Sequence, residues 1–140
     1  MKKGYFLHIP FAIIAGIAVC IGAIFGILAI IFGMLKANPA YRMGMEMAKN
    51  DPAVNALLGS PIKDGFFVGG SVMSSEYCCA TANLETSISG PKAHGTFSIY
   101  GLAHEDGSWT LEDATIRIGG KIALTYSSAE AAQGFHKPLR

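Results

Sequence analysis

Sulfur side chains are the groups in this sequence with the clearest potential for metal chemistry. The stretch MGMEM places Met43, Met45 and Met47 at alternate positions, and thioether sulfur is a soft ligand suited to Cu(I). Residues two apart do not share a face of a helix, so only Met43 and Met47 could pair, and a further ligand such as His94 would be needed. Methionine is also common where a helix packs on a sheet. Copper handling is therefore the alternative hypothesis, and the main expectation is a protein without metal or cofactor.

A cysteine–histidine pair is the other arrangement that could do chemistry, with Cys78 or Cys79 as nucleophile and His94 or His104 as base. The two histidines would lie at opposite ends of one strand, roughly 30 Å apart. Adjacent cysteines in a strand point to opposite faces, so we expect thiols rather than a disulfide. The sequence contains no hydrolase, metalloprotease, P-loop or dinucleotide motif. We therefore predict no catalytic residue and no enzymatic activity.

The stretch ISGPKAHG lies between two runs typical of strands, which predicts a hairpin turn. Gly90 and Gly95 would supply permissive backbone dihedrals, and Pro91 would fix the first corner. Lys92 and His94 would then lie at the exposed tip. The other turns expected to define the fold contain Gly59, Pro61 and Gly107.

An apolar stretch without any charged residue runs from Ile9 to Leu35. As a helix it would extend roughly 40 Å, which exceeds the roughly 30 Å of hydrocarbon in a bilayer. It is too long for the hydrophobic region of a cleaved signal peptide, and a poor cleavage site follows it. We predict an uncleaved signal anchor, a transmembrane helix over 9–35. Within it, Ala18, Gly22 and Gly26 are small residues four apart, a spacing that lets another membrane helix approach closely.

The membrane helix divides the chain into parts on two sides of the bilayer. We expect a cytoplasmic segment over 1–8, a translocated domain over 38–126 and a flexible tail over 127–140. The basic residues that flank the helix do not decide its orientation, whereas a short segment ahead of a long domain favours translocation of the domain. That domain has more acidic than basic side chains and no basic stripe, which argues against nucleic acid or anionic lipid as a partner.

Two short helices and five strands are predicted after the membrane helix. Asn38 with Pro39 begins one helix, which ends near Lys49, and Asp51 with Pro52 begins another. Runs of alternating apolar residues follow, separated by Gly, Pro and Asp. The expected strands are 65–73, 80–88, 96–104, 109–118 and 121–127. Short connections require an antiparallel meander, and a helix covering one face of it gives an α+β fold.

Alternation also predicts which side chains share a face of the sheet. In the run over 109–118 the apolar positions change parity, which predicts a bulge at Glu112–Asp113. In the last run, Ile122, Leu124 and Tyr126 are expected on one face.

Several motifs in register resemble the cytochrome oxidase complex assembly protein family. They are LGSPI after a short helix, GPK-x-x-G in a turn and DGSW between two strands, all within residues 52–126, with the membrane anchor ahead of them. The resemblance implies a single-pass inner-membrane protein whose domain lies in the periplasm or, in mitochondria, the intermembrane space. It also implies a factor in respiratory chain biogenesis that assists cytochrome c oxidase maturation, with an oxidase subunit or assembly complex in the membrane as its partner. A related fold serves in a mitochondrial presequence translocase. No catalytic residues are implied, and GPKAHG is expected to be a fold-defining turn.

Overall fold

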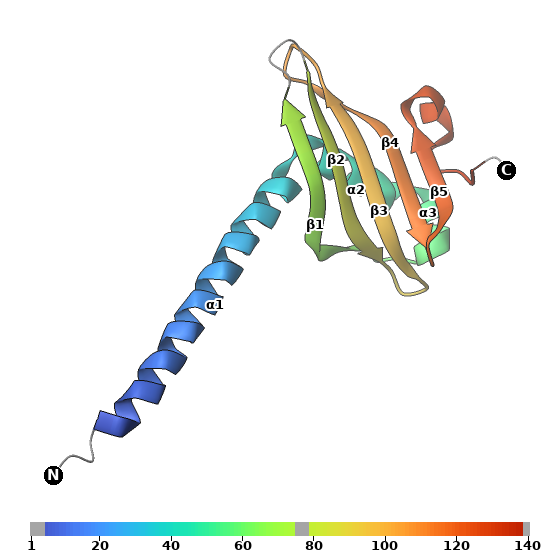
Figure 1. Ribbon diagram of the computed structural model, residues 1–140. Coiled ribbons are helices and arrows are strands. Elements are labelled where there is room, and N and C mark those ends of the chain that lie inside the picture. The colour runs from blue at the N-terminus through green and yellow to red at the C-terminus, as the bar shows by residue number, and fades with distance from the viewer. Residues whose placement is uncertain (1–4, 75–78, 139–140) are drawn as a thin grey trace. The chain divides into compact units, whose positions relative to one another are not determined.

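The computed structural model describes residues 5–74 and 79–138, and its chain divides into two compact units, Met1–Gly33 and Met34–Arg140. Helix α1 (Tyr5–Ala37) makes up the described part of the first unit, and its last four residues, 34–37, belong in sequence to the second. Among the described residues, the second unit contains two further short helices and a five-stranded antiparallel sheet (Figure 1). The predicted α+β class, an apolar helix followed by short helices and a β-meander, is confirmed.

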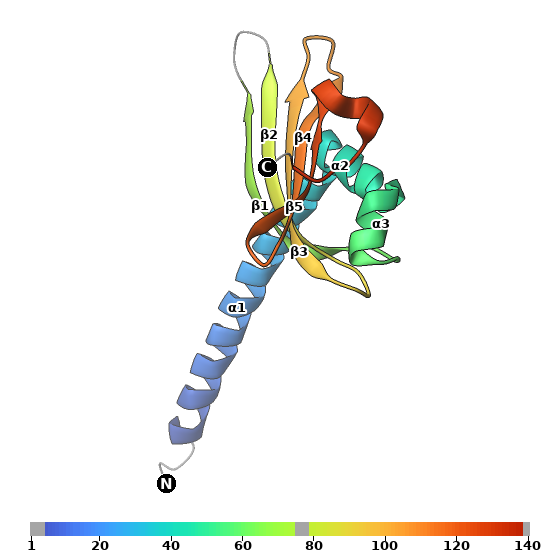
Figure 2. The same cartoon turned by 90° about the vertical axis from the view of Figure 1, so that its right-hand side faces the viewer.

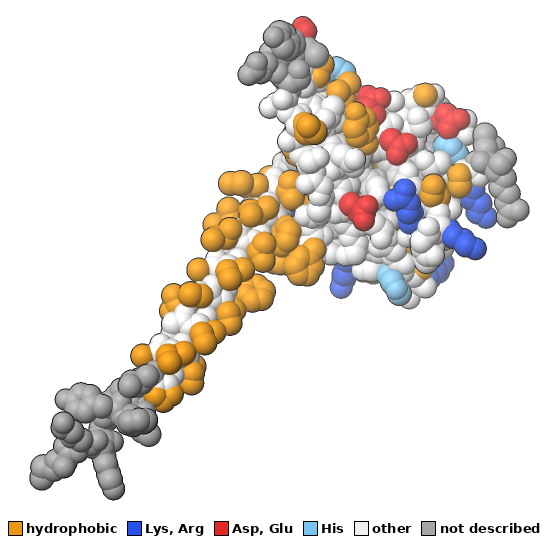
Figure 3. All heavy atoms as spheres, viewed as in Figure 1, with side chains coloured by type: hydrophobic (Ala, Val, Ile, Leu, Met, Phe, Trp, Pro, Cys, Tyr) orange, Lys and Arg blue, Asp and Glu red, His pale blue; other side chains and the backbone are white. Residues whose placement is uncertain are grey.

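Helix α1 is apolar on all sides. Its segment Pro10–Ala37, which has 28 residues, is long and apolar enough to cross a membrane. Its large hydrophobic side chains are exposed, for example Phe25 at 65% and Met34 at 71%. Figure 3 shows hydrophobic side chains and no charged ones along the described length of the visible face. The predicted helix over 9–35 is therefore present and extends slightly beyond both ends.

Helices α2 (Pro39–Asn50) and α3 (Pro52–Leu58) begin at the predicted caps. The Asn38 side chain accepts a hydrogen bond from the Ala40 N–H at 2.9 Å. The Asp51 carboxylate accepts two from the first turn of α3, at 2.8 and 3.2 Å. Each cap is followed by a proline at the first helical position, where no N–H is needed. These capping signals involve neighbouring residues only, which explains why both helix starts could be predicted from the sequence.

The sheet has the strand order β1–β2–β3–β4–β5, with each strand antiparallel to the next. The strands are β1 (Lys63–Ser74), β2 (Ala80–Ser89), β3 (His94–Ala103), β4 (Trp109–Ile118) and β5 (Lys121–Ser127). Each strand overlaps its predicted run, and β4 and β5 have the predicted bounds. Short connections thus produced the expected meander.

The bulge predicted at Glu112–Asp113 is confirmed. Tyr100 of β3 pairs with Asp113, whereas the next residue, Gly101, pairs with Leu111. Glu112 is therefore the extra residue on β4, and the inward-facing positions change from odd to even numbers there.

The core lies between the short helices and the sheet. Its largest fully buried side chains are Phe97, Leu58, Leu84, Ile88, Ile99, Ile116, Val54 and Val68. One expectation for β5 is wrong. Leu124 and Tyr126 are buried, but Ile122 is 47% exposed. The β4–β5 register shifts after Ile116, so this second bulge takes the start of β5 out of the alternation.

Both short helices lie on the same side of the sheet (Figure 2). Helix α2 buries Ala40, Gly44 and Ala48, which follow one another at intervals of one turn. A Cβ on Gly44 would lie 3.1 Å from the side chain of Ile99, and one on Gly101 would overlap the Ala40 side chain. These small residues let the helix backbone rest directly on β3.

Residues after β5 pack on the core, which the sequence did not predict. A 3₁₀-helix, η1 (Ser128–Gln133), follows β5. The Phe135 side chain is 3% exposed, and its ring centroid lies 6.1 Å from that of Phe97 and 5.8 Å from that of Tyr126. The expectation of a flexible tail over 127–140 is wrong for residues 128–136, because this segment forms η1 and then buries the Phe135 ring against the core, although its sequence has no apolar period.

The same segment occupies part of the outer edge of β5. The backbone N–H of Thr125 donates to the carbonyl of His136 at 2.8 Å, and the reverse hydrogen bond is 2.9 Å long. The sheet therefore has one edge, β5, that is partly covered by the chain itself, and a second edge at β1.

Candidate functional site

The three methionines of the copper hypothesis lie on α2 but on different sides of it. Met45 is part of the core at 4% exposure, Met43 is exposed at 38%, and Met47 is half-buried. Only Met43 and Met47 are therefore accessible enough to bind the same metal ion, as the periodicity of the helix predicts. Among residues 5–74 and 79–138, no group of three or more His, Cys, Asp or Glu side chains could hold a metal ion.

The two histidines lie apart, as predicted. His94 begins β3, and His104 follows its last residue, with His104 Nε2 3.0 Å from Thr110 Oγ1. Cys79 directly precedes β2 and therefore lies at the same end of the sheet as His104, a proximity that only the β2–β3 register reveals. Cys78, the other cysteine of the predicted pair, lies outside the described residues.

The GPKAHG turn contacts the end of α3 instead of projecting as an isolated hairpin. The Lys92 N–H donates to the carbonyl of Leu58 at 2.8 Å, and the Gly90 N–H closes the turn onto Ala93 at 2.9 Å. Gly59, with φ +80°, ends α3 against this turn. The turn therefore joins the helix layer to the sheet. The GPK motif of the turn contacts the LGSP motif at the end of α3.

The physical role of two predicted turn glycines differs from the expected one. Neither Gly90 nor Gly95 has a positive φ, so permissive dihedrals are not what these positions require, and Gly95 lies within β3 rather than in the turn. Instead, a Cβ on Gly90 would overlap the carbonyl oxygen of Leu58, and one on Gly95 would overlap that of Arg117. Gly107, by contrast, has φ +80°, as its predicted turn role requires. Pro61 follows Ser60 through a cis peptide bond.

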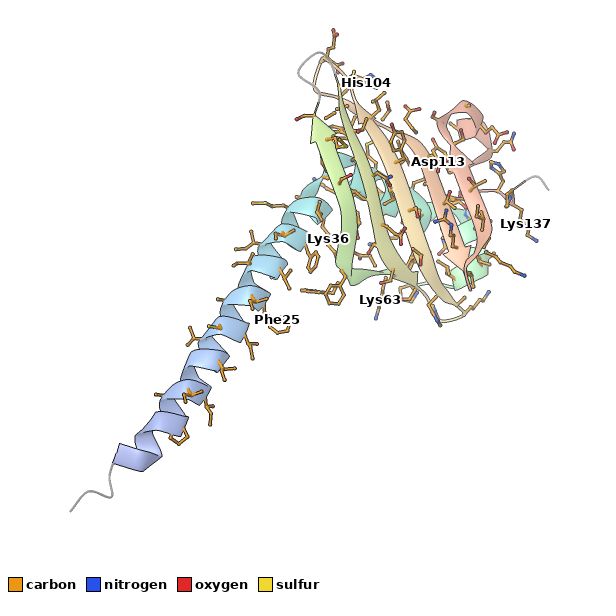
Figure 4. All side chains as sticks on the ribbon, in the orientation of Figure 1. Phe25, Lys36, Lys63, His104, Asp113 and Lys137 are labelled. Atoms are coloured by element: carbon orange, nitrogen blue, oxygen red, sulfur yellow. The ribbon has the colours of Figure 1, made fainter. Side chains whose placement is uncertain are left out.

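A polar cluster that the sequence did not reveal joins the end of α1 to β1. The Lys36 ammonium donates to Asp64 Oδ2 at 2.8 Å and to the Gly65 carbonyl at 2.7 Å. The Tyr41 hydroxyl donates to the same Asp64 oxygen at 2.8 Å. Lys36 and Asp64 are both partly exposed, at 32% and 26% of their side chains. Lys36, which Figure 4 labels, and Asp64 are far apart in sequence and belong to different elements. No local sequence motif could therefore have predicted their contact.

The cluster shifts two pKa values. Burial alone would raise the pKa of Asp64, but the hydrogen bonds from Lys36 and Tyr41 outweigh it and hold that pKa below its ordinary value of 3.8. Burial, together with the hydrogen bond to Asp64, raises the pKa of Tyr41 above its ordinary value. Asp64 is therefore the charged member and Tyr41 the neutral donor at neutral pH.

Replacing Asp64 with asparagine is expected to lower the free energy of unfolding at neutral pH by about 1 kcal/mol. Because the folded-state pKa of Asp64 is lowered, its stabilisation is present above about pH 4 and is lost as the pH falls through the folded-state pKa. The difference in unfolding free energy between wild type and Asp64→Asn should therefore shrink in acid, as denaturant titrations across the acid range would measure. Glu105→Gln, at an exposed turn, controls for the loss of one negative charge. A difference that stays constant down to low pH would contradict the assignment.

An open hollow of about 530 Å³ adjoins the polar cluster. Its charged lining consists of Lys36, Arg42, Lys49, Glu46 and Asp64. Both cations and anions line it, and neither a histidine nor a cysteine does, so the hollow offers polar contacts and no nucleophile–base pair.

The predicted helix-packing residues lie on the exposed surface of α1. Ala18, Gly22 and Gly26 are all exposed, and nothing lies within 4 Å of a Cβ built on either glycine. The backbone is therefore accessible along this line of small residues, which stays a predicted contact for another helix.

Two surfaces of the described residues could bind a partner: the line of small residues on α1 and the hollow beside Lys36 and Asp64. A family model described as cytochrome oxidase complex assembly protein 1 matches residues 13–125. The match includes most of the apolar helix and the domain as far as β5. No curated protein and no solved structure matches the chain.

Proposed function

This chain belongs to the cytochrome oxidase complex assembly protein 1 family, and from that premise we propose a non-enzymatic, membrane-anchored assembly factor. Family membership implies a role in cytochrome oxidase assembly. The finer proposal is that the chain acts by binding an oxidase subunit or an assembly intermediate in the membrane. The single observation that carries it is a family match that extends over both the apolar helix and the sheet domain.

The membrane anchor of the proposal is α1. A helix that is hydrophobic all round has no polar face to turn toward water, and Pro10–Ala37 is long enough to cross a bilayer. We place residues 1–8 in the cytoplasm and the domain in the periplasm, or in the intermembrane space of mitochondria. A reporter fused after Arg140 that is active only in the cytoplasm would reverse this topology.

The function is tested by removing the protein from its own cell and measuring assembled cytochrome oxidase by its haem absorbance. Loss of the oxidase, restored by the wild-type chain, is the expected result. A variant with Met43, Met45 and Met47 all changed to leucine should restore it equally, because the swap roughly conserves volume and removes the thioethers. Failure of that variant alone, with normal protein levels, would favour the copper-handling alternative.

The proposed membrane contact is the line of small residues Ala18, Gly22 and Gly26. Changing Gly22 and Gly26 to isoleucine keeps the helix hydrophobic but blocks close approach of another helix. We expect this double variant to lose co-purification with the oxidase from detergent. The matched control changes Gly16 and Ala23 to isoleucine, because those two residues lie on a different side of the helix. Full co-purification of both double variants would show that the contact lies elsewhere.

A further inference from the structure

The start of β1 departs from the regular ladder in a way that moves side chains outward. Asp64 pairs with Ile88, but the next paired residue of β1, Val68, lies opposite Thr86. Three residues of β1, from 65 to 67, therefore lie opposite a single residue of β2. The Thr86 hydroxyl donates to the Phe67 carbonyl at 3.0 Å, which fixes the far side of this bulge. A bulge on an edge strand changes the direction of the side chains it carries.

The side chains carried by this bulge are two phenylalanines. In a regular strand, neighbours point to opposite faces, whereas the rings of Phe66 and Phe67 lie edge to face with their centroids 5.3 Å apart. Their residues are 61% and 66% exposed. A pair of large aromatic rings held together at a surface marks a site of contact with an apolar environment.

The position of the bulge identifies that environment. The carbonyl of Gly65, directly before Phe66, accepts a hydrogen bond from Lys36 at 2.7 Å. Lys36 belongs to the last turn of the apolar segment Pro10–Ala37. The bulge is therefore tied to the point where the chain leaves the bilayer. The polar interface extends roughly 5 to 7 Å on each side of the hydrocarbon core, within reach of side chains that start one residue from this hydrogen bond.

We infer that Phe66 and Phe67 form a membrane-interface anchor, with both rings seated in the headgroup and upper acyl region of the lipid on the side where the domain lies. Phenylalanine, like tryptophan and leucine, is typical of the apolar face that interfacial segments bury roughly 5–10 Å into the boundary between headgroups and acyl chains. The contact is with lipid in general and requires no anionic headgroup. The inference rests on the proposed anchoring of the chain by α1.

Tryptophan fluorescence in vesicles tests the anchor. The chain has a single tryptophan, Trp109, so a Trp109→Phe background allows one new tryptophan at a time. Phe66→Trp and, independently, Phe67→Trp are made in the full chain and reconstituted in phosphatidylcholine vesicles, part of whose lipid carries bromine on the upper acyl carbons. We expect loss of emission from both tryptophans when brominated lipid is present, and emission at a shorter wavelength than that of an aqueous tryptophan.

Two further positions make the outcome decisive. Met73→Trp tests a site on the same strand that is 67% exposed and roughly 20 Å from Phe67 along the strand, and it should keep its emission. Phe25→Trp reports on α1 and should lose emission when the bromine lies deep in the acyl chain. If Phe25→Trp is not quenched, the anchoring of α1 fails, and the anchor at the bulge fails with it. If Phe25→Trp is quenched but either bulge variant is not, or if Met73→Trp is quenched as strongly as they are, the inference is overturned while the anchoring stands. Circular dichroism confirms that each variant is folded.

Discussion

Replacing Phe135 with alanine is expected to lower the free energy of unfolding of the domain by about 3 kcal/mol. The ring is 3% exposed and lies against Phe97 and Tyr126, so its removal leaves a cavity at the base of the core. The variant should also weaken the bridge between His136 and Thr125, because the ring that packs the neighbouring residue against the core is lost. Denaturant unfolding of the detergent-solubilised chain, followed by circular dichroism, measures the loss.

The matched control for Phe135→Ala is Lys137→Ala, two residues further along the same segment and exposed. It should change the free energy of unfolding by less than about 0.5 kcal/mol. If both variants unfold at the wild-type denaturant concentration, the segment after β5 does not contribute to the fold.

Replacing Gly90 with alanine is expected to destabilise the domain by about 2 to 3 kcal/mol. The new Cβ would overlap the carbonyl oxygens of Leu58 and Gly59, and backbone atoms cannot move aside by rotating a side chain. The end of α3 and the hairpin turn would have to separate, which strains the hydrogen bond from Lys92 N–H to Leu58. The midpoint of urea unfolding should fall accordingly.

Gly69→Ala is the control for the effect of adding a methyl group to a strand glycine. Its Cβ would meet only the Glu85 carbonyl, at 4.0 Å, so its free energy of unfolding should stay within about 0.5 kcal/mol of wild type. Equal midpoints for the two glycine variants would mean that the turn and α3 are not in close contact.

Features encoded locally were predictable from the sequence. The caps at Asn38 and Asp51 depend on two or three adjacent residues, and both are confirmed. The bulge at Glu112 was visible because the apolar positions change parity within one strand. Periodicity and capping act over a single element, which is why they located the helices and the strands.

Features that depend on contacts between distant elements were not predictable. The hydrogen bond between Lys36 and Asp64 joins residues separated by 28 positions, and the packing of Phe135 depends on a core that forms only in the folded sheet. Gly90 was expected to supply backbone freedom, whereas the structure shows that a Cβ there would overlap a carbonyl oxygen at the end of α3, a contact between distant elements. The type of a charged or aromatic residue does not by itself show which distant residue it contacts in the folded chain.

The bridge between Thr125 and His136 has a consequence for self-association. Endless growth of a fibre by edge-to-edge addition requires each molecule to accept a neighbour at both outer strands. Here the outer edge of β5 is already paired with the chain's own His136 at Thr125. A molecule that paired with a copy through β1 would therefore have no equally open outer strand left for a further copy. Pairing of two molecules through β1 would therefore stop at two.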